Sequence, residues 1–595
     1  MVYKIADNIT SPLGMTTAEN YSAVKDGHSV LRHFVGKWGI PEPFCASLFN
    51  DVQNDAMLID GMTRFESMVV CSIRHALKDI TFNIAGPDVV FLLATTKANV
   101  EQLGCDMTTP SVVYPGESAL HISQAIGITT TPIVVSNACI SGLSAIIAGC
   151  RLLESGQYAH AIVCGADVLN RFVISGFQSL KALSEDTCKP FDMERLGLNL
   201  GEAAATIVLS VEPGNESRPW SILSGAIHND AYHISAPSKR GDGAYLCLKE
   251  VLQGIDINDV AFVNAHGTAT LFNDQMESVA IERVGLGDIP VNALKGYYGH
   301  TLGAAGVVET LLCMRSLDDH TVLGTKGYEE LGVSGKIRIS STHGTTDKNC
   351  FVKMISGFGG CNATLVAGLV TSEVLRLRSK DKEPMPLLLK EREKKNILYE
   401  TKDEICIMPE GVTLNDQALT CHGHGKELLT NLYKEYVGDY PKYYKMDGLS
   451  KLGFIASELL LHSGRGNKTE TSDDAEFTFG RCAIILFNHS SSLCADKHYL
   501  ESIEDKDNYF PSPSLFVYTL PNIVTGEIAI KNGLHGETAF YILPERNETT
   551  MRQVVDATFL DPSIDSMITG WIDYEDDQHF EADMRMIRVK REKPR

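Results

Sequence analysis

The chain contains one pattern of helix and strand twice, and this repeat limits the folds that it can adopt. A proline-led turn, a helix, a glycine and an apolar strand follow one another in PGESALHISQAIGITTTPIVVSNAC (115–139) and again in PNIVTGEIAIKNGLHGETAFYILPE (521–545). A strand with a central glycine follows each block, at Gly165, 26 residues after Cys139, and at Gly570, 25 residues after Glu545. Two unrelated α/β domains would match more loosely, so order and spacing predict two units of one α/β plan.

Short apolar runs alternate with helical segments from residue 1 to about residue 370, which is typical of an α/β fold. PDVVFLLAT, PIVVSNA, AHAIVCGAD and DVAFVNAHG are predicted strands, and SGLSAIIAGCRLLESG is a predicted helix. Between residues 373 and 400 the chain becomes dense in charge and holds two prolines, which predicts an exposed connector. We therefore expect a first domain at 1–370, a charged linker at 371–404 and a second domain at 405–590.

Composition argues against several classes of function. The formal net charge of -22 opposes non-specific binding to nucleic acid, which requires a clustered basic surface. No apolar run has the length of a membrane helix, and MVYKIADNIT lacks the features of a signal peptide, so we expect a cytoplasmic protein. The 15 cysteines lack paired spacing, and the ligands of Cys421-His422-Gly423-His424 are too close together, so we expect no metal site.

Cys139 follows an apolar strand directly and precedes a helix. Unsatisfied N–H groups at a helix N-terminus favour thiolate over thiol, so the position suits a nucleophile. Taken alone, a cysteine after a strand is more often a packed core residue. Further residues must therefore support the interpretation.

Two histidines lie at comparable positions. His266 ends the apolar run VNAHG, and His300 lies on a glycine-rich turn five residues after Lys295. Each histidine alone is more often structural, but a thiol and two imidazoles at strand ends of one domain form a workable set for nucleophilic and acid/base chemistry. The loop Gly357–Gly360 lacks the Lys-Ser/Thr of a phosphate loop, so we interpret it as a backbone donor loop with a gating phenylalanine, Phe358.

Together these segments closely resemble the elongating β-ketoacyl-acyl-carrier-protein synthases, in that family's own order. The resemblance rests on SPLG, SNACISG, FQSLKALSEDTCKPFDMERLGLNLGEAA, DAYHISAPSKRGDG, NAHGTAT, LKGYYGHTLGAAG and GFGGCN, and it spans nearly all of residues 1–370. It implies a thiolase-like layered αβαβα fold, followed by a second α/β domain that is similar to the N-terminal half of a ketosynthase. The chain departs from the family at GLNLGEAAA, at the MIS before the loop, and in a shorter segment before the nucleophile.

The resemblance also implies roles for single residues. Cys139 is the nucleophile, and His266 and His300 are the catalytic histidines. Lys295 is the supporting lysine and Glu309 its ion-pair partner. The remaining implied roles are backbone N–H groups of Cys139 and Phe358 as an oxyanion hole, Phe358 as the gate, and Thr268 and Thr270 as hydrogen-bond partners of the pantetheine arm.

The implied reaction is a decarboxylative Claisen condensation of an acyl thioester with malonyl-carrier protein, in fatty acid, polyketide or polyene biosynthesis. We expect no tightly bound cofactor, because phosphopantetheine arrives on the acyl carrier protein. Glu545 aligns with Cys139, so the second domain lacks the nucleophile. It is either a decayed duplicate or a pseudo-dimer partner that resembles a chain-length factor. A homodimer remains open.

Two alternative functions stay open at this stage. A thiolase acting on coenzyme A esters would need a second cysteine near the end of the domain, and Cys361 lies there. A non-catalytic, chain-length-factor-like partner of another ketosynthase would fit the second domain but not the first. The starter, the product and the carrier-protein docking surface are not specified by these residues.

Overall fold

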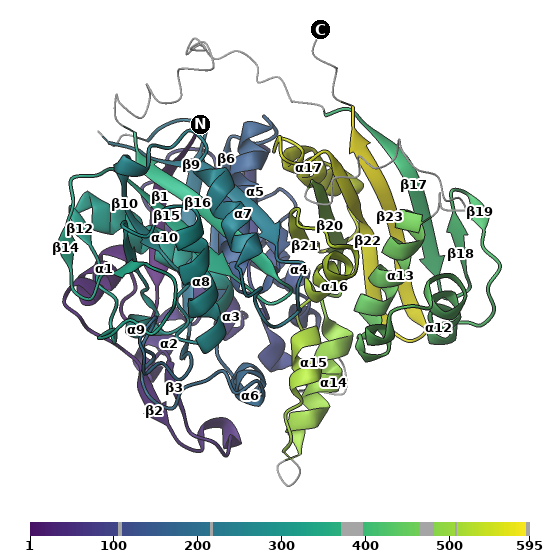
Figure 1. Ribbon diagram of the computed structural model, residues 1–595, viewed down its shortest axis with the longest axis horizontal. Helices are drawn as coiled ribbons and strands as arrows, with labels where there is room; N and C mark the ends of the chain where they lie inside the picture. The colour runs from purple at the N-terminus through teal and green to yellow at the C-terminus, as the bar shows by residue number, and fades with distance from the viewer. Residues whose placement is uncertain (105–109, 215–217, 371–396, 463–480, 506–508, 591–595) are drawn as a thin grey trace.

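A continuous run of paired β-strands joins the two parts of the chain (Figure 1). The computed structural model describes residues 1–104, 110–214, 218–370, 397–462, 481–505 and 509–590. We call residues 1–370 the first half and residues 397–590 the second half.

The first half contains two large sheets, besides two small ones of two and three strands. The strands of the first sheet, in spatial order, are β5 (Ile133–Val135), β4 (Val89–Ala94), β6 (His160–Asp167), β8 (Ala203–Ser210) and β1 (Val2–Thr10). Those of the second sheet are β13 (Arg338–Ile339), β11 (Pro290–Asn292), β10 (Val260–Asn264), β15 (Cys350–Ser356), β16 (Cys361–Leu369) and β9 (Trp220–Asn229).

Helices lie between and outside these two sheets. The inner helices, α5 (Ser141–Glu154) and α10 (Ala305–Asp318), contact strands of both sheets. The outer helices are α3 (Arg64–Ala76) on the first sheet and α7 (Asp242–Val251) and α8 (Leu271–Arg283) on the other side. The predicted α/β class and the layered αβαβα order are therefore confirmed. Smaller first-half elements are α1 (Thr17–Lys25), α2 (Asp51–Met57), α4 (Pro115–Ile126), α6 (Arg171–Ser179), β2 (Arg32–Phe34) and β3 (Phe44–Ser47).

The apolar runs in the sequence form the strands expected of them. β4, β5, β6 and β10 lie within the four predicted strand segments, and α5 lies within the predicted helix. Every residue of β4 and of β10 is buried, which is why these segments read as unbroken apolar runs rather than alternating ones.

The second half repeats the strand order of the first sheet. Its strands, in spatial order, are β21 (Thr538–Ile542), β20 (Cys482–Asn488), β22 (Ser566–Asp576), β23 (His579–Val589) and β17 (Tyr399–Met408). Each neighbouring pair is parallel or antiparallel as in the first sheet. Its helices are α12 (Lys426–Leu432), α13 (Gly448–His462), α14 (Leu493–Glu504), α15 (Pro513–Tyr518), α16 (Ile523–Asn532) and α17 (Glu548–Thr558).

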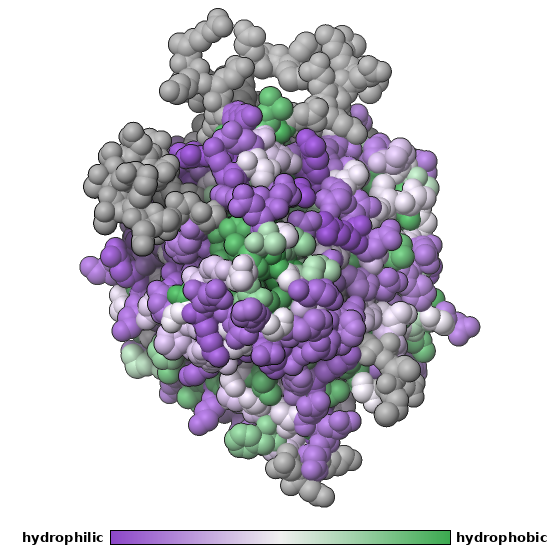
Figure 2. All heavy atoms as spheres, turned by 90° about the vertical axis from the view of Figure 1, so that its right-hand side faces the viewer, coloured by the Kyte–Doolittle hydropathy of each residue, from purple (hydrophilic) through white to green (hydrophobic). Residues whose placement is uncertain are grey.

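The face of the molecule formed by the second half is mostly hydrophilic, with one small apolar hollow (Figure 2). Along β17 and β23, buried residues such as Ile405 and Met584 alternate with polar ones such as Glu404 and Arg585. Glu404 and Arg585 form an ion pair at 4.0 Å. This alternation is typical of a sheet with one face in water, so the strands do not require a second sheet to cover them.

The two halves join through an antiparallel contact between β5 and β21. Val135 pairs with Tyr541, and the Asn137 side-chain oxygen accepts a 2.7 Å hydrogen bond from the Phe540 N–H. Asn137 is two residues before Cys139, so the joint lies next to the predicted nucleophile.

Buried ion pairs cross the same joint. Arg151 of α5 contacts Glu537 at 2.5 Å and Asp561 at 2.8 Å. Lys97 contacts Asp496 at 2.6 Å and donates to the carbonyl group of Thr519. A buried charge without an ion-pair partner costs free energy, so these pairs fix the placement of one half against the other.

The predicted domain boundaries remain a prediction. Residues 371–396 of the expected linker lie outside the described residues, and β17 begins at Tyr399, inside the segment that we assigned to the linker. A boundary at residue 405 would therefore assign the first residues of β17 to the linker.

We predict that replacing Lys97 by methionine leaves the buried Asp496 carboxylate without its ion-pair partner between the two halves. We expect the free energy of unfolding to fall by about 3 kcal/mol, as for other buried pairs that lose one partner. The double variant Lys97→Met/Asp496→Leu should recover most of that loss, because neither charge remains. Urea unfolding of wild type, both single variants and the double variant would measure the coupling. Single variants within about 1 kcal/mol of wild type would contradict it.

Candidate active site

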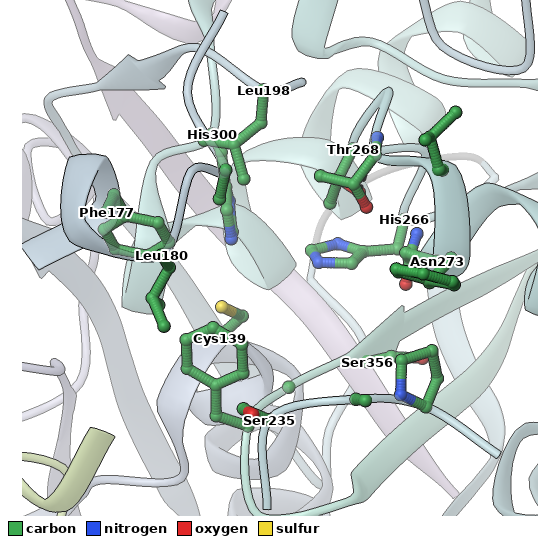
Figure 3. Close-up of a pocket in the computed structure, with 18 of the residues that line it drawn as sticks. Cys139, Phe177, Leu180, Leu198, Ser235, His266, Thr268, Asn273, His300 and Ser356 are labelled. Atoms are coloured by element: carbon green, nitrogen blue, oxygen red, sulfur yellow. Dashed lines mark hydrogen bonds between the residues drawn. The ribbon is translucent and has the colours of Figure 1, made fainter. Parts of the chain in front are cut away.

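A cavity of about 400 Å³ opens in the first half, and the predicted nucleophile lies in its wall. Cys139, His266 and His300 all line it. Figure 3 shows the two imidazoles pointing towards the Cys139 sulfur from different sides. One ring nitrogen of each histidine and the sulfur lie within 4.8 Å of one another. The structure thus brings together the three residues that the sequence places on separate segments.

The turn that carries Cys139 is strained and closely held. β5 ends at Val135, a 3-10 turn spans Ala138–Ile140, and α5 begins at Ser141. Ala138 has a φ of +47°, a conformation that L-residues rarely adopt. The Ser141 hydroxyl donates to the Ala138 carbonyl at 2.6 Å and accepts from the Asn137 N–H at 2.8 Å. These contacts offset part of the strain and direct the thiol into the cavity.

The expected preference of Cys139 for the thiolate is not what the structure supports. Burial raises the pKa of the Cys139 thiol to about 12, against a smaller lowering influence of Lys295. The helix begins at Ser141 as expected, and a hydrogen bond at the Cys139 backbone lowers the thiol pKa by less than burial raises it. Cys139 therefore rests as a thiol at neutral pH.

His266 and His300 are both buried and stand almost perpendicular to each other. Their ring centroids are 4.9 Å apart, with 83° between the ring planes. Burial, together with the positive charges of Lys295 and Lys353, holds the pKa of both imidazoles well below the usual range. Both rings are therefore neutral at pH 7. Nδ1 of His266 and Nε2 of His300 have no hydrogen-bond partner among the described residues, so both remain available to a ligand.

The tautomer of His300 is set by its own turn. The Leu302 N–H points at Nδ1 of His300 at 3.3 Å, so Nδ1 accepts and Nε2 carries the proton. A protonated Nε2 donates hydrogen bonds and does not ligate a metal ion. Although the trio has the spacing of a metal site, this tautomer suits a donor to a substrate oxygen.

Lys295 and Glu309 form the ion pair expected from the resemblance. The Lys295 ammonium lies 2.6 Å from a Glu309 oxygen and donates to the carbonyl group of His266 at 2.5 Å. Thr268 and Thr270 line the cavity, and their hydroxyl groups are 2.8 Å apart. The structure thus pairs Lys295 with Glu309 and places both threonines in the cavity wall, while the roles that the resemblance implies for them remain predictions.

The loop that carries Phe358 packs against the nucleophile and against the second half. A Cβ on Gly357 would lie 3.2 Å from the Cys139 nitrogen, so the loop passes close to that backbone. Asn522 of the second half donates to the Phe358 carbonyl at 2.8 Å. The Phe358 ring stacks on Phe177 with centroids 6.2 Å apart.

Three further residues build the site and were not singled out from the sequence. The Asp167 carboxylate accepts from the N–H groups of Thr96 and Gly303, and burial raises its pKa to about 6. Glu277 accepts from the N–H of His266 at 2.6 Å. Lys353 is fully buried beside Glu309. Lys353 interrupts an apolar run and Asp167 ends one, but a polar residue in such a place does not identify its partner, and no comparable signal marks Glu277.

Comparison with known families matches the first half in two consecutive segments. Residues 53–213 match the Beta-ketoacyl synthase, N-terminal domain, and residues 221–329 match the Beta-ketoacyl synthase, C-terminal domain. Cys139 lies in the first segment, and His266 and His300 lie in the second.

Curated relatives match the same region. Nodulation protein E of Rhizobium meliloti is 30% identical over 264 residues, which cover 42% of this chain and 65% of that protein. The 3-oxoacyl-(acyl-carrier-protein) synthase 2 of Rhizobium meliloti strain 1021 is 33% identical over 252 residues, which cover 39% of this chain and 59% of that protein. The chain spans less than two thirds of the length of these relatives.

Solved structures extend the likeness to the fold. The ketosynthase ApeO in complex with its chain length factor ApeC from Xenorhabdus doucetiae matches 62% of this chain and 98% of its own, with 25% identity and a TM-score of 0.54. A structure described as PfaC keto synthase-chain length factor matches 99% of this chain and 78% of its own, with a TM-score of 0.77. At 14% identity the second likeness concerns the fold alone, which is the predicted thiolase-like fold across both halves.

Because burial disfavours its thiolate, we predict slow alkylation of Cys139 at neutral pH. With a pKa of about 12 the thiolate fraction at pH 8 is on the order of 10⁻⁴. The rate with iodoacetamide should therefore keep rising with pH up to at least about 10. Peptide mapping of the adduct, with Cys139→Ser as control, would give the profile. An alkylation rate that stops rising near pH 7 would contradict a raised pKa for the Cys139 thiol.

Proposed function

The chain belongs to the β-ketoacyl synthase family through residues 53–329, and on that premise we propose that it is an acyltransferase of the 3-oxoacyl-carrier-protein synthase type. The reaction is the decarboxylative Claisen condensation of an acyl thioester with malonyl-carrier protein. The observation that carries the proposal is one thiol and two neutral imidazoles that converge in a single cavity.

In the first step the Cys139 sulfur attacks the carbonyl carbon of an acyl thioester. The new C–S bond forms, the carrier thiolate leaves, and the Cys139 proton passes to it. N–H groups of Cys139 and Phe358 are the proposed donors to the oxyanion. The closeness of Gly357, the residue before Phe358, to the Cys139 backbone nitrogen supports this pairing.

In the second step malonyl-carrier protein loses carbon dioxide. The electron pair of the breaking C–C bond forms an enolate, whose oxygen accepts hydrogen bonds from His266 and His300. The enolate carbon attacks the acyl-Cys139 carbonyl, which yields the 3-oxoacyl product, and the released thiolate takes up a proton. The fixed Nε2–H tautomer of His300 supports the donor role, since a neutral donor needs no further proton transfer.

The acyl carrier protein is the proposed partner, and its phosphopantetheine arm would reach Cys139 through the cavity. Thr268 and Thr270 are the proposed hydrogen-bond partners of that arm. Leu196 and Phe272 line the same cavity and are each 76% exposed, so apolar side chains rim its mouth.

We propose no tightly bound cofactor, and fatty acid, polyketide or polyene biosynthesis as the pathway class. We also propose a cytoplasmic location. In the described residues no helix is long and apolar enough to span a membrane.

Two alternatives are less well supported. In a thiolase, a second cysteine would have to exchange protons with the substrate, but the Cys361 thiol already donates to the Phe358 carbonyl at 3.2 Å. A non-catalytic chain-length partner would not require the complete set of thiol, imidazoles and lysine. Glu545, which aligns with Cys139, is a carboxylate exposed to solvent, so the second half has no thiol at that position. Only the second half therefore fits the description of a non-catalytic partner.

For the second half we propose the place of a dimer partner that closes the acyl end of the cavity. Phe516 of α15 packs against Phe177, which lines the cavity, with ring centroids 5.5 Å apart. Gly176 gives Phe516 its space, because a Cβ there would lie 2.1 Å from the Phe516 ring. The second half would thereby resemble a chain-length factor fused to its synthase, which makes the molecule a pseudo-dimer.

Intact mass would test the nucleophile. After incubation with acyl-carrier proteins of several chain lengths, we expect wild type to gain the mass of one acyl group and Cys139→Ala to gain none. Cys361→Ala should still be acylated, which separates the two cavity cysteines. Absence of an adduct with every donor would favour the non-catalytic alternative.

The role of Phe516 predicts a change in chain length. Phe516→Ala removes the ring behind Phe177, so longer acyl groups should acylate Cys139 at least about tenfold faster relative to short ones, the effect expected when a pocket gains room for one or two methylenes. Phe510→Ala is the matched control, since Phe510 is 76% exposed in the same half. An unchanged preference in Phe516→Ala would contradict the closing role.

A further inference from the structure

The backbone at His266 is held through both its N–H and its carbonyl groups. Oxygens of Glu277, in α8, accept from the N–H groups of His266 at 2.6 Å and Gly267 at 2.8 Å. Glu277 is 0% exposed, and burial raises its pKa to about 7. The turn is thus tied to α8 on its donor side.

Two lysines hold the carbonyl side of the same turn. Lys295 donates to the carbonyl group of His266 at 2.5 Å, and Lys353 donates to that of Ala265 at 3.4 Å. Both ammonium groups contact one carboxylate, Glu309. The three charged side chains come from α9 (Lys295–Tyr298), β15 and α10, so they connect three elements to one turn.

Lys353 is the unexpected member of this set. Lys295 and Glu309 balance each other, whereas Lys353 adds a second positive charge at 0% exposure. It lies on β15 opposite Asn264, the last residue of β10, two residues before His266. Burial lowers the pKa of Lys353 and the Glu309 carboxylate opposes that lowering, so contact with Glu309 favours the charged ammonium group.

We propose that Lys353 is a positioning residue for His266: it anchors the Ala265 carbonyl and the Glu309 carboxylate, and thereby holds the imidazole against the cavity beside Cys139. The inference deepens the proposed function, because it concerns the decarboxylation step assigned to His266 and His300. Acylation of Cys139 does not depend on it.

The positive charge of Lys353, like its hydrogen bonds, favours the active state of His266. The charged or titratable groups that face it are Glu309 and Cys313 of α10, Lys295 of α9 and Glu277 of α8. The positive charge of Lys353 disfavours an imidazolium at His266 and at His300. Removing it should raise the pKa of both rings, so the neutral, active form should be lost at a higher pH than in wild type.

Lys353→Met tests this role with a side chain of similar length. We expect kcat for condensation to fall on the order of tenfold, as for a catalytic group displaced by a fraction of an ångström. The acidic limb of the kcat profile should move up by about one pH unit. KM for malonyl-carrier protein and the extent of Cys139 acylation should stay unchanged. Lys353→Arg, which retains the charge, should keep the acidic limb of wild type.

Lys348→Met is the matched control. Lys348 also donates to a carbonyl group of β10, that of Val260 at 2.9 Å, but at the far end of the strand. Its loss should leave the pH profile unchanged even if the protein becomes less stable.

Titration of the His266 imidazole tests the positioning role of Lys353 without an activity assay. In protein labelled with ¹³C at histidine, with His266→Gln used for assignment, the His266 midpoint should lie higher in Lys353→Met than in wild type and in Lys348→Met. Equal midpoints together with an equal condensation rate would overturn the inference. A wild type that never forms an acyl adduct would instead overturn the proposed function, and the titration would still give its own answer. If Lys353→Met does not fold, a wild-type acidic limb in Lys353→Arg would support the role of charge and a raised limb would refute it.

Discussion

The close approach of two glycine-containing segments places Cys139 beside the two cavity histidines. Gly142 at the start of α5 meets Gly303 so closely that a Cβ would lie 2.6 Å from the Gly303 oxygen, and a Cβ on Gly306 would lie 2.5 Å from the Leu143 nitrogen. Cys139 precedes one of these segments and His300 the other. Any side chain there would push the starts of α5 and α10 apart, and the distance from sulfur to imidazole would grow with them. The chemistry of the cavity depends on this backbone contact.

The same packing explains why the site is buried and why its groups are electrically neutral. Burial raises the pKa of Cys139 and lowers those of His266 and His300, so a thiol faces two neutral imidazoles. Charge is confined to the layer behind them, where Lys295, Lys353 and Glu309 hold the histidine turn. The second half packs against the other side, through β21 beside the turn that carries Cys139 and through Asn522 on the loop that carries Phe358.

Much of this arrangement could be predicted from the sequence, because it depends on local pattern. Unbroken apolar runs specify β5 and β10, and the strand-end positions of Cys139 and His266 follow from where those runs stop. The protonation of Cys139 could not be predicted, since burial is a property of the assembled layers. Glu277, Lys353 and Phe516 escaped notice for a related reason: their partners lie on segments distant in sequence, and no spacing rule connects them.

The central claim is that carbon–carbon bond formation at Cys139 is driven by decarboxylation. Acylated protein mixed with malonyl-carrier protein that carries ¹³C in its free carboxyl group tests it directly. We predict one labelled carbon dioxide for each 3-oxoacyl-carrier protein formed, and neither product with Cys139→Ala. Formation of the 3-oxoacyl product without labelled carbon dioxide, or an acyl-enzyme that malonyl-carrier protein never consumes, would contradict the account.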